Sequence, residues 1–198
     1  MCRYQHSIIL SADKNGYRKG DLIMDSLTIY YDDNKLKCTK YAELFSKYDN
    51  VICKKASDFL NRSVIHEENE NVGFLFESNM EKVPYAVSHI IWKLIMNKPG
   101  NCFVMVTGGS REISALRTAR TDLERRGYHV NSIYLQYIFD KYHMDIQEAV
   151  EKMMSDFEMG YKNILHYKEK AKNFTSKQIK KKLRKELKSY KHYYRKKR

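Results

Sequence analysis

The chain has 198 residues and a formal net charge of +13, and its length suits one domain with a sizeable core. No apolar run reaches the roughly 18 residues of a membrane span, and the first residues do not form a signal peptide. The four cysteines and seven histidines are dispersed without metal-binding spacing. We therefore expect a cytoplasmic protein with reduced cysteines and no metal site.

The excess positive charge lies at the C-terminal end of the sequence. Residues 168–198 hold 15 of the 37 Lys/Arg and 2 of the 24 Asp/Glu, and residues 1–167 hold 22 of each. An apolar stripe predicts that this tail is helical, with positions Ile179, Leu183, Leu187, Tyr190 and Tyr194. Such a tail contacts nucleic acid or an anionic membrane, packs on the domain or a partner helix, or is simply solvated.

The first 142 residues predict an α/β domain. Residues 1–25 form either a loose hairpin or an extension. Strands are expected at 27–31, 50–53, 72–76, 102–106 and 128–134, and helices at 39–48, 56–60, 84–97 and 111–126. Strands that alternate with helices imply right-handed crossovers and a parallel sheet. We predict a doubly wound, five-stranded sheet in the order 2-1-3-4-5 within residues 26–142.

A C-terminal helix is expected within residues 143–167. Its apolar face should pack in the core, and its members are Ile146, Val150, Met153, Met154, Phe157 and Tyr161. The single tryptophan, Trp92, lies in an apolar helical stretch and is also expected in the core. Residues 168–198 then form the basic tail.

The segment 107–110 (Thr-Gly-Gly-Ser) follows a short apolar run and precedes an amphipathic helix. Ser110 is a suitable N-cap for that helix, and Gly127 is suited to its C-terminal end. Loops at the carboxyl ends of parallel strands are where open α/β sheets bind ligands. The two glycines therefore either approach a ligand or only form a tight turn.

Two parts of this region resemble the flavodoxin-like family. The first is Gly73-Phe74-Leu75-Phe76, followed by seven residues and Pro84, and the second is Val106-Thr107-Gly108-Gly109-Ser110 with Ala115-Leu116 on the next helix. The resemblance covers about residues 26–142. It is closest to the flavodoxin half of flavodoxin/ferredoxin fusion proteins of anaerobic bacteria. No cysteine follows Cys102, so the iron–sulfur half is not expected.

The resemblance implies a flavin mononucleotide (FMN) cofactor and a role as an electron-transfer protein or oxidoreductase. A redox partner protein or a small-molecule acceptor would then exchange electrons with the flavin. By resemblance, one side of the flavin ring is flanked by Glu77, Ser78, Asn79 and Met80. The other side is flanked by Thr107, Gly108, Gly109 and Ser110.

The family holds the FMN phosphate in a loop after the first strand, which here is residues 32–39. That loop has no glycine and begins with Asp32 and Asp33, whose carboxylates repel a phosphate dianion. Lys35 and Thr39 are the candidate phosphate donors. We therefore predict weak or lost flavin binding. The alternative is a non-catalytic flavodoxin-like binding module whose basic tail contacts an anionic partner.

Overall fold

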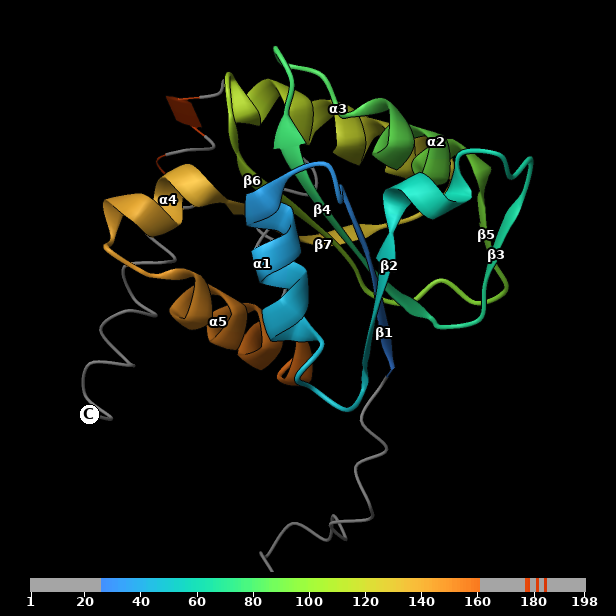
Figure 1. Cartoon of the computed structure of the whole chain (residues 1–198), viewed down its shortest axis with the longest axis horizontal. Helices are drawn as coiled ribbons and strands as arrows, with labels where there is room; N and C mark the ends of the chain where they lie inside the picture. The colour runs from blue at the N-terminus through green and yellow to red at the C-terminus, as the bar shows by residue number, and fades with distance from the viewer. Residues whose placement is uncertain (1–25, 161–176, 179–180, 182–183, 185–198) are drawn as a thin grey trace, which may run out of the picture.

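The computed structural model describes residues 26–160, together with residues 177, 178, 181 and 184. A five-stranded parallel sheet lies at its centre, with helices on both faces (Figure 1). Its strands lie in the order β2 (Val51–Lys55), β1 (Leu27–Tyr31), β4 (Asn71–Ser78), β6 (Cys102–Gly109) and β7 (Val130–Leu135). Counted among themselves along the chain, these five strands stand in the order 2-1-3-4-5. The α/β class and the five-stranded parallel sheet are confirmed.

Two longer helices cover each face of the sheet (Figure 1). The helices α1 (Leu36–Phe45) and α5 (Ile146–Glu158) pack together on one face, and α2 (Tyr85–Lys93) and α3 (Glu112–Arg125) pack together on the other. A short α4 (Gln136–Lys141) follows β7, and a 3-10 helix, η1 (Ala56–Phe59), follows β2.

The core forms where the apolar strands meet the apolar faces of these helices. The strands β4 and β6 are covered on both sides, so almost every residue along them is buried. On α3, the buried residues Ile113, Leu116, Ala119 and Leu123 recur at three- and four-residue spacing, as the sequence predicts. Each fully buried aliphatic or aromatic side chain stabilises the fold by about 1.5–3 kcal/mol.

The segment predicted as one helix over 84–97 divides into two elements. Helix α2 ends at Lys93, and β5 (Leu94–Met96) pairs in parallel with β3 (Ile65–Glu67) as a separate two-stranded sheet. The apolar side chains of 94–96 continue a helical pattern, but the buried Ile65 lies opposite Leu94 and favours strand pairing. Trp92, at the end of α2, is 42% exposed, so its predicted place in the core is wrong.

The N-terminal end of α3 also differs from the prediction. The N-cap residue is Arg111, in a left-handed conformation with φ 53°, and not Ser110. The reason is that β6 continues through Gly108 and Gly109, because Gly109 pairs with Ser78 of β4. Gly127 adopts φ 87° after the last turn of α3, as predicted.

Helix α5 begins with a capping box, in which Asp145 accepts from the backbone N–H of Glu148 and the Glu148 side chain accepts from the backbone N–H of Asp145. Val150, Met153 and Met154 are buried, so the Met-rich face is confirmed as core packing. The helix ends at Glu158, and Tyr161 lies outside the described residues.

The expectations for residues 1–25 and for most of the tail also lie outside the described residues. Within the part of the chain that is described, no helix has the length and apolar character to cross a membrane.

Candidate functional site

The loops that follow β1, β4, β6 and β7 lie along one edge of the sheet, because the strands are parallel and adjacent. This edge carries all the residues that the sequence nominates. Glu77 and Ser78 end β4, Asn79 and Met80 follow in the loop, and Thr107, Gly108 and Gly109 end β6. The structure therefore brings the two nominated segments together.

The two segments contact each other directly. The Ser78 hydroxyl donates to the Ser110 carbonyl at 2.7 Å, and the Arg111 guanidinium forms an ion pair with Glu81. A Cβ atom at Gly109 would overlap the Ser78 carbonyl, so only glycine allows this approach. The loop after β4 is a tight turn, closed by paired backbone hydrogen bonds between Asn79 and Lys82.

Several residues with a left-handed backbone conformation lie at this edge. Within the described residues, four non-glycine residues have positive φ, and three of them are Met80 (47°), Glu81 (74°) and Arg111 (53°). Non-glycine residues adopt this conformation at an energetic cost, and such strain tends to cluster at binding sites. The edge is therefore where we locate the candidate site.

Thr107 lies below the surface of the edge. Its side chain is fully buried, and its Oγ1 lies 3.1 Å from the Cys38 Sγ of α1 in a hydrogen bond. Burial raises the pKa of the Cys38 thiol to about 12, despite the hydrogen bond to Thr107, which lowers it. Thr107 therefore fixes α1 against β6 in this structure.

Polar side chains of the loop after β1 form hydrogen bonds and an ion pair within the protein. Asp33 accepts from the backbone N–H of Ser57 at 3.0 Å and from its hydroxyl at 2.7 Å. The Lys35 ammonium lies 3.4 Å from the Glu77 carboxylate. The Thr39 hydroxyl donates to the Lys35 carbonyl at 3.4 Å. Both nominated phosphate donors, Lys35 and Thr39, thus already have partners.

Asp32 is the buried carboxylate of this loop. Its exposed fraction is 2%, and one of its carboxylate oxygens accepts from the Asn34 backbone N–H at 3.3 Å. Burial raises the pKa of Asp32 above its usual range, although the hydrogen bonds from Asn34 oppose this. For Asp33, burial alone would raise the pKa, but the hydrogen bonds from Ser57 outweigh it and lower the pKa.

Large apolar side chains are exposed around the same edge. Leu36, the first residue of α1, is 73% exposed, and Met80 is 79% exposed. The ion pair between Lys35 and Glu77 joins the segment that carries Leu36 to the segment that carries Met80. Apolar side chains that loops present at the carboxyl edge offer contact area to a ring-bearing ligand.

A cleft of about 280 Å³ opens where β6 and β7 end. Its walls come from the end of β6, the first turn of α3 and the start of α4, and its residues are Gly109, Arg111, Glu112, Ile113, Ser114, Leu135 and Tyr137. Of the nominated residues, only Gly109 lines it. Sequence reasoning missed Leu135, at the end of β7, and Tyr137 of α4, because they meet α3 only through the tertiary fold.

Tyr137 is held in place from two directions. Its backbone N–H donates to the Glu112 carboxylate at 3.4 Å, across the cleft wall. The guanidinium of Arg184, from the basic tail, donates to the Tyr137 hydroxyl at 2.6 Å and lies 5.5 Å from the ring centre. The Tyr142 hydroxyl donates to the Arg184 carbonyl at 2.8 Å. At this residue, the tail contacts α4.

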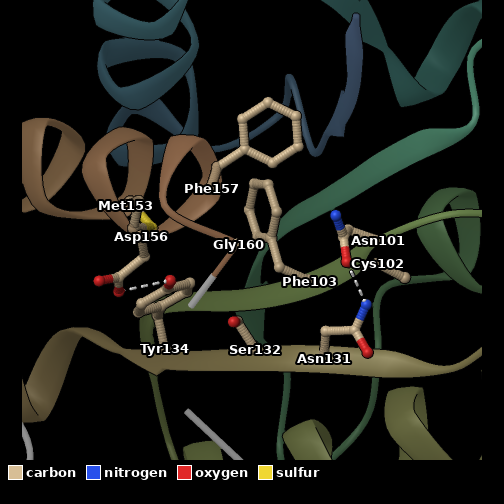
Figure 2. Close-up of a pocket in the computed structure, with 10 residues that line it drawn as sticks. All are labelled: Asn101, Cys102, Phe103, Asn131, Ser132, Tyr134, Met153, Asp156, Phe157 and Gly160. Atoms are coloured by element: carbon tan, nitrogen blue, oxygen red, sulfur yellow. Dashed lines mark hydrogen bonds between the residues drawn. The ribbon is translucent and has the colours of Figure 1, made fainter. Parts of the chain in front are cut away.

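A second, smaller cavity lies near the opposite edge of the sheet, beneath α5 (Figure 2). Its volume is about 20 Å³, enough for about one water molecule. Phe103, Met153 and Phe157 form apolar walls, and the Tyr134 hydroxyl donates to the Asp156 carboxylate at 2.8 Å. This cavity is too small for a cofactor, so the carboxyl edge remains the candidate site.

The sequence matches no model of a known protein family and no curated protein. Among solved structures, the fold is similar to the apo form of an NADH:FMN oxidoreductase, with 10% sequence identity and a TM-score of 0.45. The similarity covers 68% of this chain and 89% of that chain. Within the described ranges, no group of three or more His, Cys, Asp or Glu side chains could hold a metal ion.

Proposed function

We propose that this chain is a flavodoxin-like protein that binds a flavin of the FMN type by its ring and serves in electron transfer. The observation that carries the proposal is the cleft of about 280 Å³ at the carboxyl edge, which begins at Gly109. Gly109 belongs to the segment that resembles a flavin-flanking loop of that family. Clefts at this edge are the usual ligand sites of open α/β sheets.

The walls of the cleft suit an aromatic ring. Ile113, Leu135 and Tyr137 are the apolar residues of the lining, and Arg111, Glu112 and Ser114 are its polar residues. Helix α3 begins at Glu112, so its N-terminal end lies at the cleft, with the Glu112 carboxylate in the first turn. These residues would hold and orient the ring and limit its contact with water.

The phosphate of FMN does not have a matching set of donors. Lys35 and Thr39 are engaged with Glu77 and with the Lys35 carbonyl, and Asp32 is buried beside them. When bound, a flavin supplies reversible uptake of electrons, and the protein supplies only position and electrostatics. We therefore propose weak FMN binding through the ring, with a redox partner or a small-molecule acceptor.

Absorption spectroscopy tests this proposal. The freshly purified chain is titrated separately with FMN and with riboflavin, and the change in the visible flavin bands is followed. We expect saturable binding with a dissociation constant in the micromolar range or above. Ser114→Phe should place a bulky ring in the cleft and abolish the change, whereas Ser88→Phe, on α2 outside the cleft, should preserve it. If neither flavin binds to the unaltered chain, the proposal is wrong.

A second candidate is a non-catalytic binding module of the same fold. The observation that favours it is the direct contact between the two predicted flavin loops, through Ser78 and Ser110. Its ligand would be a nucleic acid that contacts the basic tail, residues 168–198. Binding of single-stranded RNA should then weaken steeply with salt, because phosphate contacts release counterions. Binding only to anionic vesicles would instead assign the tail to a membrane surface.

A further inference from the structure

The polar side chains of the loop after β1 affect which flavin the carboxyl edge can bind. The inference drawn from them rests on the proposed function. They lie where the family places the phosphate. Asp33 accepts two hydrogen bonds from Ser57. Lys35 forms an ion pair with Glu77, and the Thr39 hydroxyl donates to a backbone carbonyl. The two candidate donors, Lys35 and Thr39, are therefore turned toward partners within the protein.

The charges of this loop also oppose a phosphate. Asp32 is 2% exposed and lies shortly before the start of α1, and Glu77 lies 3.4 Å from the Lys35 ammonium. Two carboxylates near a dianion raise its energy, and Lys35 neutralises only one charge.

The cleft offers no alternative site for a phosphate among the described residues. The Arg111 guanidinium, on the cleft wall, is paired with Glu81. The Glu112 carboxylate occupies the first turn of α3, where it already interacts with the positive end of the helix. Its bond to the Tyr137 N–H also holds it at the cleft. A phosphate at the cleft would therefore meet the Glu112 carboxylate.

We propose that the carboxyl edge selects a ring ligand without a phosphate, so that riboflavin binds more tightly than FMN. The specificity-determining residues are Asp32 and Glu77. Removing their charges should relieve the repulsion, and Glu77→Gln should also release the Lys35 ammonium toward the ligand. Neither residue lines the cleft, so both substitutions should leave the cleft lining unchanged.

Parallel titrations of the full chain test the proposal. Riboflavin and FMN are titrated separately by difference absorption at constant ionic strength, and the ratio of their dissociation constants is compared. In the unaltered chain, FMN should bind about tenfold more weakly than riboflavin, a difference of about 1.4 kcal/mol. In Asp32→Asn/Glu77→Gln, the ratio should fall at least threefold while the riboflavin affinity is preserved.

The controls separate charge from folding. Glu77→Gln alone alters a half-buried side chain and should give part of the effect. This single variant therefore tests the charge even if the buried Asp32→Asn change affects folding. Asp58→Asn removes a carboxylate of η1 and should leave the ratio unchanged. If riboflavin binds but FMN binds equally well or better, this inference is wrong and the proposed function stands. If neither flavin binds, both are wrong.

Discussion

The ammonium of Lys152 lies 2.5 Å from the Asp156 carboxylate, one turn further along α5, and both side chains are almost completely buried. The same carboxylate oxygen accepts from the Tyr134 hydroxyl, and the ammonium lies 5.7 Å from the centre of the Tyr134 ring. The other oxygen, Oδ1, is buried without a hydrogen-bond partner among the described residues. This pair joins α5 to β7 within a mostly apolar surrounding.

Breaking this pair should destabilise the fold strongly. Lys152→Met removes the ammonium and leaves the Asp156 charge buried, which should cost about 3–5 kcal/mol in the free energy of unfolding. The double variant Lys152→Met/Asp156→Leu removes both charges and should recover most of that loss. Urea unfolding followed by circular dichroism measures both values. Glu158→Gln, on the exposed end of the same helix, is the control and should change little.

Gly109→Ala should be considerably more destabilising than Gly127→Ala. Both glycines have positive φ, at 93° and 87°, so both substitutions carry the backbone cost of about 1–2 kcal/mol. Only at Gly109 would the new methyl group also overlap the Ser78 carbonyl, whereas no atom lies near it at Gly127. The overlap should add about 1–3 kcal/mol. Equal unfolding free energies for the two variants would contradict the close contact between β4 and β6.

Much of the sheet could be predicted, because β1, β4 and β6 are apolar runs that helices cover on both faces. The small elements could not be predicted. β3 and β5 have three residues each, and their pairing depends on Ile65 and Leu94, which lie far apart in the sequence. The role of Arg111 as N-cap depends on the pairing of Gly109 with Ser78. The cleft was missed for the same reason, since Leu135 and Tyr137 meet α3 only through the tertiary fold.

Asp32→Asn and Asp33→Asn should change stability in opposite directions at neutral pH. The folded state raises the pKa of Asp32, so the protonated form of this side chain favours folding. That contribution is complete below about pH 4 and is lost as the pH rises through the pKa of the folded state. The Asp32→Asn variant should therefore be more stable than the unaltered chain at pH 7. The folded state lowers the pKa of Asp33, so its stabilisation is present at pH 7 and is lost on acidification.

The measurement for this pair is urea unfolding at pH 7 and at pH 4. Asp33→Asn should lower the unfolding free energy at pH 7, and the difference should shrink at pH 4. Asp32→Asn should raise it at pH 7, with a smaller gain in acid. A loss of stability at pH 7 for Asp32→Asn would show that this carboxylate stabilises the start of α1.

The thiols of Cys38 and Cys102 should resist alkylation in the folded protein. Both are buried, and burial raises the pKa of each thiol to about 12, so very little thiolate is present at pH 8. Iodoacetamide should modify them only after unfolding in urea, as measured by mass spectrometry of tryptic peptides. Rapid labelling of Cys38 without urea would show that α1 opens away from Thr107.

Tyr137 connects the cleft to Arg184, a residue of the basic tail. The ring forms a wall of the cleft, and its hydroxyl binds Arg184, which lies 47 residues further along the chain. A polyanion that draws Arg184 away removes a support of that wall. If release of Arg184 changes the affinity of the cleft for its ligand, that ligand must change the affinity of Arg184 for the polyanion by the same factor. The Tyr137 hydroxyl thus connects two parts of the chain that share no sequence motif.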